Sequence, residues 1–395
     1  MRTVIKNADL ILPDRVLENG WMLVEDDTIK DIGSMEMVLP DGDDIIDVSG
    51  CLVMAGMIDV HSDMIEQVLQ PRSTALMDFE VGLQEAEKQL AACGITTMYH
   101  SISMYRDGAW EVKEIRKARH VKKLADLIKV MDKGKKMINH KYHLRYEIDN
   151  IECYDDVVKM LEDGKADLIS FMDHSPCQGQ YRDLSVYRRH MPNEGKDITD
   201  EEFEALIERQ LNKPKVSHAQ LKELAALAVR NGVAIASHDD DSVEKLVKNE
   251  EFGVAISEFP ITLEVAKRAC EMGYYTVLGS PNILLGGSHA GNLSAMEAIS
   301  NGVGSILCSD YYPQALLRAV FKVEEDLQLP IWKACNMVTL HPAKAVKIDK
   351  EYGSLEVGKK ADFLIVKRNG AQSHLLETWV NGNAVMRVNQ IGGVA

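Results

Sequence analysis

The sequence predicts an α/β protein, a (β/α)8 TIM-like barrel with a small β-sandwich domain built from both chain ends. Three observations carry this prediction. The middle of the chain alternates short apolar runs with amphipathic segments, its length suits eight strand–helix units, and both ends are rich in short β-like runs. We expect the sandwich over residues 1–50 and 345–395 and the barrel over residues 51–344.

Turn signals separate the apolar runs near both ends of the chain. Pro13-Asp14, Asn19-Gly20 and Asp41-Gly42 interrupt the first fifty residues. Asn381-Gly382 lies between two apolar runs near the other end, which is a strong hairpin signal. Because both ends share this pattern around a different middle, we expect them to form one β domain together.

The middle of the chain carries eight short apolar runs separated by helical spacing. Thr199 with Glu202 and Ser217 with Gln220 fit capping boxes that open helices. A doubly wound sheet is the alternative to a barrel, but no GxGxxG motif follows an early strand. We expect the strand cores at residues 52–60, 95–101, 142–148, 167–173, 233–237, 252–257, 275–279 and 304–309.

Composition and charge exclude several classes of protein. The chain has 395 residues and a formal net charge of −16, so nucleic acids and anionic membranes are poor partners. The sequence contains no run of about 18 apolar residues, the length needed to span a membrane, and its first residues lack a secretory h-region. The seven cysteines are scattered and form no CxxC, which favours reduced thiols in a cytoplasmic protein.

Polar residues gather where the apolar runs end. His61, His174, His238 and Asp310 each follow such a run. In a parallel barrel all of these ends lie on one face, where active sites are built. Imidazole and carboxylate together suit zinc, iron or manganese, and His61 shares one strand face with Asp63. The sequence therefore predicts a metal centre, and a two-oxygen carboxylate such as Glu147 could bridge two cations.

Structural roles compete with ligation at several of these positions. We expect His100 to be a hydrogen-bonded core residue, His140 to lie on the surface and Asp239–Asp241 to form a solvated loop or helix start. For His143, which shares a strand face with Glu147, ligand and structural roles are evenly matched.

A polar, glycine-rich loop over residues 286–292 follows the seventh expected strand. Barrels often bind phosphate with the loops after their last two strands, where backbone N–H groups meet the oxygens. We therefore expect Gly287, His289 and Asn292 at a phosphate site, although a flexible turn would have the same composition. Arg72 and Arg182 are further anion-binding candidates, because a guanidinium pairs bidentately with phosphate.

The chain resembles the amidohydrolase superfamily of metal-dependent hydrolases along nearly its full length. Within it, the closest resemblance is to the PhnM family of phosphonate metabolism. The segments that carry the resemblance are residues 7–11, 56–63 with 71–72, 172–176 with 180–181, 236–240, 258–260, 286–292, 309–313 and 353–362.

The resemblance implies hydrolysis of α-D-ribose 1-methylphosphonate 5-triphosphate to the 5-phosphate and pyrophosphate. It implies two divalent ions, with zinc preferred over manganese or iron, and a phosphorylated small molecule as the partner. Asp310 would take the proton from the attacking water. The superfamily's usual His-x-His is His61-x-Asp63 in this chain. The metal shell would consist of His61, Asp63, Glu147, His174, His238 and Asp310.

Two other interpretations of the same residues are open. An amidohydrolase that cleaves a C–N bond in a cyclic amide, acyl-amino compound or nucleobase would use the same metal shell, since activated water attacks carbonyl and phosphoryl centres alike. The glycine-rich loop and the arginines favour a phosphorylated substrate over this alternative. A non-enzymatic scaffold within a lyase complex is disfavoured by the intact set of ligands. The β domain and the barrel sides offer surface for a homodimer.

Overall fold

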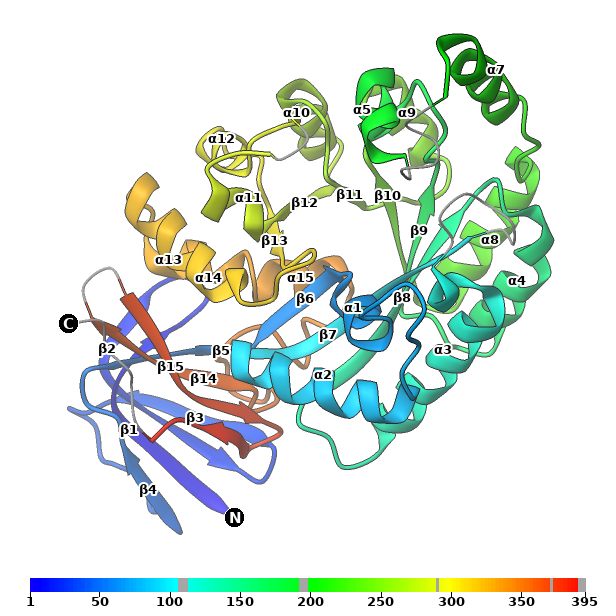
Figure 1. Ribbon diagram of the computed structural model, residues 1–395. Coiled ribbons are helices and arrows are strands. Elements are labelled where there is room, and N and C mark those ends of the chain that lie inside the picture. The colour runs from blue at the N-terminus through cyan, green and yellow to red at the C-terminus, as the bar shows by residue number, and fades with distance from the viewer. Residues whose placement is uncertain (106–112, 192–197, 289–290, 370–371, 390–395) are drawn as a thin grey trace.

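Eight parallel strands form a nearly closed barrel, as the sequence predicts, and a separate sheet is built from both chain ends (Figure 1). The computed structural model describes residues 1–105, 113–191, 198–288, 291–369 and 372–389. The barrel strands, each paired with the next, are β6(Met57–Ser62), β7(Ile95–Met104), β8(Asn139–Glu147), β9(Leu168–Met172), β10(Ala234–His238), β11(Ile256–Glu258), β12(Tyr275–Gly279) and β13(Ile306–Cys308).

Helices follow the strands and cover the outside of the barrel (Figure 1). Both predicted capping boxes are present, with Thr199 opening α7 and Ser217 opening α8. Within the described residues, no helix combines the length and apolar character needed to cross a membrane. The helices are α1(Met64–Leu69), α2(Phe79–Cys93), α3(Ala118–Lys133), α4(Tyr154–Glu162), α5(Leu184–His190), α7(Asp200–Leu211), α8(His218–Arg230), α9(Val243–Glu250), α10(Leu263–Glu271), α11(Ser280–Leu285), α12(Ala295–Ser300), α13(Ala315–Leu327), α14(Ile331–Asn336) and α15(Leu340–Ala345).

The second sheet joins strands from the two ends of the chain in the order β16-β15-β14-β5-β1-β2-β3, with β4 paired to β1. Strand β5 also belongs to this sheet, so the apolar run expected as one strand over residues 52–60 is two strands that part at Gly56. The domain boundaries themselves remain a prediction. The sheet strands are β1(Arg2–Ile11), β2(Val16–Glu25), β3(Thr28–Ser34), β4(Asp44–Asp47), β5(Cys51–Ala55), β14(Phe363–Asn369), β15(Gln372–Val380) and β16(Asn383–Arg387).

The barrel interior changes from apolar to polar along its axis. Val60, Leu168 and Ile256 belong to one buried cluster that also packs against Ala343 of α15. Toward the carboxyl ends of the strands, the buried side chains become imidazole, guanidinium and carboxylate groups. Because strand β8 presents alternate residues to one side, His143, Arg145 and Glu147 all contribute to this polar layer.

A buried hydrogen-bonded chain of three side chains links β7, β8 and α2. His100 Nε2 lies 2.9 Å from His140 Nδ1, and His140 Nε2 lies 3.2 Å from Glu87 Oε1. Burial, and then the neighbouring His140, hold the pKa of His100 well below its usual range. The structural role expected for His100 is confirmed, whereas the surface position expected for His140 is wrong because this network lets its ring be buried.

Candidate active site

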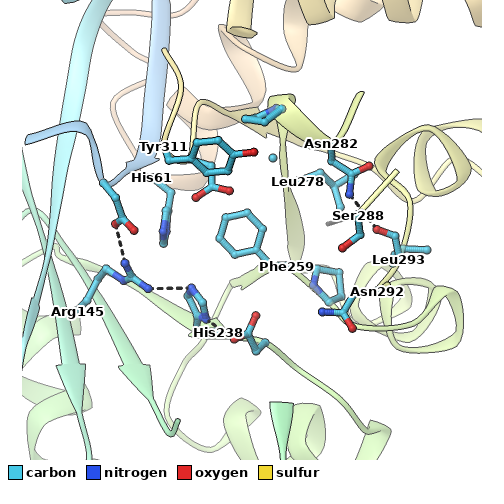
Figure 2. Close-up of a pocket in the computed structure, with 16 residues that line it drawn as sticks. His61, Arg145, His238, Phe259, Leu278, Asn282, Ser288, Asn292, Leu293 and Tyr311 are labelled. Atoms are coloured by element: carbon cyan, nitrogen blue, oxygen red, sulfur yellow. Dashed lines mark hydrogen bonds and ion pairs between the residues drawn. The ribbon is translucent and has the colours of Figure 1, made fainter. Parts of the chain in front are cut away.

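A pocket of about 300 Å³ opens at the carboxyl ends of the barrel strands (Figure 2). His61, Asp63, His238 and Asp310, all predicted from the strand ends, line it together with Asn292 of the glycine-rich loop. The remaining lining residues are Arg145, Asp239, Phe259, Pro260, Leu278, Gly279, Pro281, Asn282, Ser288, Leu293 and Tyr311.

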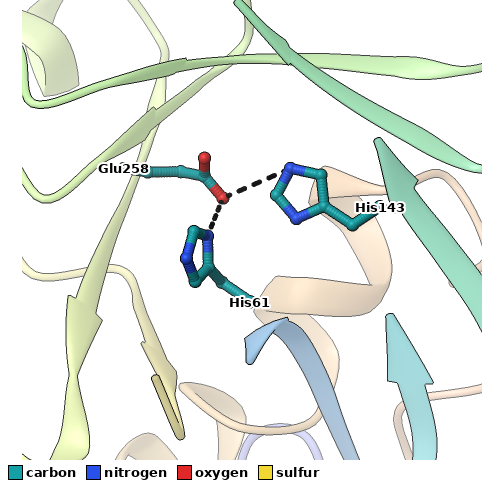
Figure 3. Close-up of side chains that lie close together, drawn as sticks. All are labelled: His61, His143 and Glu258. Atoms are coloured by element: carbon teal, nitrogen blue, oxygen red, sulfur yellow. Dashed lines mark hydrogen bonds and ion pairs between the residues drawn. The ribbon is translucent and has the colours of Figure 1, made fainter. Parts of the chain in front are cut away.

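A fully buried network holds His61 in place below the pocket (Figure 3). His61 Nδ1 lies 2.8 Å from Glu258 Oε1, and Ser170 donates a 2.7 Å hydrogen bond to the other Glu258 oxygen. His143 Nε2 lies 2.5 Å from the Ser170 hydroxyl. Burial alone would raise the pKa of Glu258, but His61, His143 and His238 together outweigh burial and hold that pKa below its usual range.

A second cluster combines His174, His238 and Asp239. Their ligand atoms lie within 4.8 Å of one another. Glu147, at the end of β8, accepts a short hydrogen bond from His174 Nδ1. His174 Nε2 then lies 3.9 Å from Asp239 Oδ2. An imidazole that donates through one nitrogen to a carboxylate presents its other nitrogen to a metal ion.

The donors of this second cluster fit a divalent cation. His238 Nδ1 and Asp239 Oδ2 lie 3.1 Å apart, and both are buried without a hydrogen bond of acceptable geometry. Buried polar atoms without partners are rare in proteins because their desolvation is uncompensated. Nitrogen and oxygen donors together match the ligands that zinc prefers. The residues present therefore fit the metal ion, and His174, His238 and Asp239 would hold it.

Arg145 forms an ion pair inside the same pocket. Its Nη1 donates to Asp63 Oδ1 at 2.7 Å, and its Nη2 lies 3.2 Å from His238 Nε2 (Figure 2). Burial by itself would raise the pKa of Asp63, but the charges of Arg145, His61, Arg116 and His238 together outweigh burial and lower that pKa to about 2. Asp63 is therefore ionised at neutral pH and faces a fixed positive charge.

Three residues just after the strand ends have left-handed backbone conformations. Asp239, Phe259 and Asp310 have φ values of 50°, 54° and 56°. Such conformations cost free energy in residues other than glycine, and they gather at functional sites where neighbouring structure enforces them. All three side chains line the pocket.

The structure separates the other predicted substrate-binding residues from the pocket. Arg72 and Arg182 are exposed, and neither lines it. The backbone N–H of Gly287 donates to Asn282 O at 2.9 Å, which ends α11. His289 lies outside the described residues.

Sequence reasoning missed Arg145, Asp239 and Glu258 of this site and the burial of the neighbouring Asp240. Arg145 lies midway between His143 and Glu147, and the period of a strand could have placed it on their face. The solvated run expected at Asp239–Asp241 is wrong for Asp239 and Asp240, which are buried. Asp240 accepts 2.5 Å hydrogen bonds from the hydroxyls of Ser237 and Ser257, so its burial is compensated. Glu258 directly follows the strand expected over residues 252–257, and no role is predicted for it from the sequence.

Comparisons with known proteins identify the family. The amidohydrolase family matches residues 191–389. The chain is 29% identical to the alpha-D-ribose 1-methylphosphonate 5-triphosphate diphosphatase of Escherichia coli K12, over 97% of this chain and 100% of that protein. It is 24% identical to the imidazolonepropionase of Flavobacterium johnsoniae, over 89% of this chain and 86% of the relative.

Solved structures share the fold. A prolidase crystallised with N-methylphosphonate-L-proline superposes with a TM-score of 0.64 at 16% identity, and the match covers 98% of this chain and 100% of that one. The barrel, the polar layer at its strand ends and the family match agree with one another. The chain therefore belongs to the amidohydrolase family and is a metal-dependent hydrolase.

Proposed function

We propose that this enzyme hydrolyses α-D-ribose 1-methylphosphonate 5-triphosphate to the 5-phosphate and pyrophosphate. The observation that carries the proposal is the similarity to the Escherichia coli diphosphatase, which extends over 97% of this chain and the whole of that relative. The pocket supports a phosphorylated substrate, because a buried guanidinium and the polar side chains of Ser288 and Asn292 face it.

We further propose that zinc is held by His174, His238 and Asp239. The unpartnered buried atoms of His238 and Asp239 support this assignment. A divalent ion bound there would act as a Lewis acid that polarises a phosphoryl oxygen and increases the acidity of water. Among the described residues, a second group of candidate ligands consists of His61, His143 and Glu258.

The hydrogen bonds within the group of His61, His143 and Glu258 suggest that Glu258 and His143 orient His61. Glu258 is engaged through both oxygens, by His61 and by Ser170. His143 is engaged at Nδ1 by the carbonyl oxygen of Val60, 3.1 Å away. We therefore propose that these side chains hold His61 toward the pocket.

Side chains of the pocket carry out proton removal and charge stabilisation in our proposal. Asp310 lines the pocket as a carboxylate and takes the proton of the attacking water in our proposal. The water oxygen forms the new bond to phosphorus, and the phosphoanhydride P–O bond breaks with its electron pair leaving on pyrophosphate. The fixed positive charge of Arg145 stabilises the negative charge that develops on the transferred phosphoryl group.

Phosphorus NMR of the zinc-loaded protein with the ribose methylphosphonate triphosphate tests the proposal. Equal amounts of pyrophosphate and 5-phosphate are the expected products. Orthophosphate in place of pyrophosphate, or no turnover at confirmed zinc occupancy, would contradict it. An aliquot treated with chelator and restored with zinc controls for loss of folded protein.

Hydrolysis of a C–N bond is the second candidate function. The similarity to the Flavobacterium johnsoniae imidazolonepropionase, 24% identical over 89% of this chain, favours it. Turnover of 4-imidazolone-5-propanoate by the same zinc-loaded sample, with none of the triphosphate, would select this alternative.

A further inference from the structure

The pocket has a charged side and a neutral side (Figure 2). His61 and Arg145 lie on the charged side. The side chains opposite them are uncharged and come from β12, from α11 and from the loop that follows α11. We call this group the neutral wall, and it consists of Leu278, Asn282, Ser288, Asn292 and Leu293. A ligand in the pocket therefore meets two chemically different surfaces.

Asn282 ties together the two ends of the glycine-rich loop. Its backbone oxygen accepts a 2.9 Å hydrogen bond from the N–H of Gly287, where the loop leaves α11. Its side-chain Nδ2 donates to the carbonyl oxygen of Leu293 at 3.3 Å (Figure 2). Its Oδ1 accepts from the backbone N–H of Ala295 at 3.0 Å. Because one partner is an acceptor and the other a donor, the orientation of the amide is fixed.

The return of the loop is anchored a second time. The backbone N–H of Leu293 donates to the carbonyl oxygen of Ile261 at 3.0 Å. Ser288 directly follows the anchored Gly287, and Asn292 directly precedes the anchored Leu293. Each of these two pocket side chains therefore starts from a backbone position next to an anchor. A side chain that is already placed loses less entropy when a ligand binds.

The chemistry of the neutral wall suits the hydroxyl groups of a sugar. A serine hydroxyl and an asparagine amide can each donate and accept a hydrogen bond without carrying charge. A sugar hydroxyl does the same, whereas a phosphoryl anion that leaves water needs a positive partner. Leu278 and Leu293 offer apolar surface to the C–H groups of a sugar ring.

We propose that the neutral wall binds the pentose ring of the substrate. Ser288 and Asn292 form hydrogen bonds to its hydroxyl groups, and Asn282 is the positioning residue that holds both of them in place. This inference rests on the proposed function for the identity of the sugar. It gives Asn292 a sugar hydroxyl in place of the phosphate expected from the sequence, and it leaves the phosphoryl groups to the charged side of the pocket.

Calorimetry with methyl α-D-ribofuranoside 5-phosphate and its 2-deoxy and 3-deoxy analogues tests the sugar contacts on the zinc-loaded protein. The methyl group keeps the ring closed, and each analogue lacks one of the two ring hydroxyls. Ser288→Ala and Asn292→Ala are each expected to raise the dissociation constant of the parent ligand about 2- to 10-fold, the cost of one neutral hydrogen bond. The same variant should leave unchanged the affinity for the analogue that lacks its hydroxyl partner.

The comparison between ligands separates a sugar contact from a general disturbance of the pocket. A side chain with a merely structural role would weaken all three ligands equally when it is removed. Equal losses for the three ligands in both variants would therefore overturn the proposal. Absence of binding by the wild type, or wild-type affinities in both variants, would overturn it as well.

Asn282→Ala tests the positioning role. We expect it to bring the affinities for the parent ligand and the deoxy analogues close together, because neither Ser288 nor Asn292 is then held against the sugar. Asn282→Asp keeps the acceptor for the N–H of Ala295 but loses the donor to Leu293, so an intermediate result is expected. Preference for the parent ligand at the wild-type ratio in both variants would overturn this role.

Asn301→Ala is the matched control for Asn282→Ala. Asn301 Nδ2 also donates to a backbone carbonyl oxygen, that of Glu297 at 2.9 Å, but it does so at the exposed end of α12. This variant should bind all three ligands as the wild type does.

The binding measurements are independent of turnover. A wild-type protein that releases no pyrophosphate but distinguishes the parent ligand from its deoxy analogues through Asn292 would contradict the proposed function and support this inference. Release of pyrophosphate by a protein that does not distinguish the three ligands would support the proposed function and overturn the inference.

Discussion

The backbone N–H of Asp63 donates a 2.7 Å hydrogen bond to the carbonyl oxygen of Asp310. The N–H of Asp310 donates in turn to the carbonyl oxygen of His61, at 3.1 Å. These two bonds join the ends of β6 and β13, the first and last strands of the barrel. The same two hydrogen bonds therefore close the barrel and place the pocket carboxylates of Asp63 and Asp310.

Asp310→Asn is expected to lower kcat by at least about 100-fold, because general-base catalysis contributes about 10²–10⁴. Asparagine tolerates the left-handed backbone at this position, and the barrel-closing hydrogen bonds are made by the backbone. The release of pyrophosphate, followed by phosphorus NMR, measures the effect. Asp14→Asn on an exposed turn is the matched control. Wild-type turnover in Asp310→Asn would remove this carboxylate from the mechanism.

Glu147→Gln is expected to weaken zinc binding about 10- to 100-fold, the usual cost of losing a carboxylate partner of a ligating histidine. The physical reason is that His174 Nδ1 loses the acceptor that orients its ring. Titration with zinc in a metal buffer gives the affinity. Glu223→Gln, which loses only a surface hydrogen bond from Tyr154, is the control. Zinc content that stays at zero at saturation would instead identify Glu147 as a direct ligand.

The free energy of unfolding is expected to fall as the pH drops below about 6.5, and His100 should account for part of the slope. Burial and His140 hold the pKa of His100 far below its usual range in the folded state. Below pH 6.5 the unfolded chain therefore binds a proton that the folded protein excludes. That proton contributes about 1.4 kcal/mol per pH unit.

Urea unfolding at several pH values measures this slope for the wild type and for His100→Asn. Between pH 5 and 6 the variant should lose the contribution of about one proton, although its stability at pH 8 is also lower because the ring packing is lost. Parallel pH dependences in the two proteins would show that His100 is not the group responsible. His374→Asn in the terminal sheet controls for the removal of any histidine.

Gly56→Ala is expected to destabilise the protein by about 1–3 kcal/mol or more, the usual cost of overpacking. A Cβ atom at this position would overlap the side chain of Thr96 at the junction of β5 and β6. Gly134→Ala is the control, since its Cβ would lie 3.6 Å from the nearest atom at an ordinary φ of −88°. Chemical denaturation compares the two variants. Equal midpoints would show that the junction relaxes without strain.

The parts of the site that the sequence revealed are those that end strands. His61, His174, His238 and Asp310 follow apolar runs, and parallel strands bring such positions to one face. Arg145 lies within β8, where a single-residue pattern does not distinguish an interior charge from a surface charge. Its role depends on Asp63 and His238, which are distant in sequence.

Burial and strand breaks were harder to predict because they depend on tertiary neighbours. Asp240 is buried through hydroxyl donors on β10 and β11, a match that no local pattern contains. The run over residues 52–60 is apolar except for Asp59, although it crosses from one sheet to the other. Gly56 marks that crossing, but a glycine inside an apolar run is equally typical of a bulge.

The terminal sheet cannot be completed until the last strands of the chain have been synthesised. Strand β5 lies between β1, which is synthesised before it, and β14, which emerges last among its neighbours. Roughly 300 residues separate β5 from β14, so at about 5–20 residues per second one edge of β5 stays unpaired for roughly 15–60 s on the ribosome. An unpaired apolar edge invites pairing with other chains. Nascent chains of this protein therefore carry an aggregation-prone edge until their final strands are made.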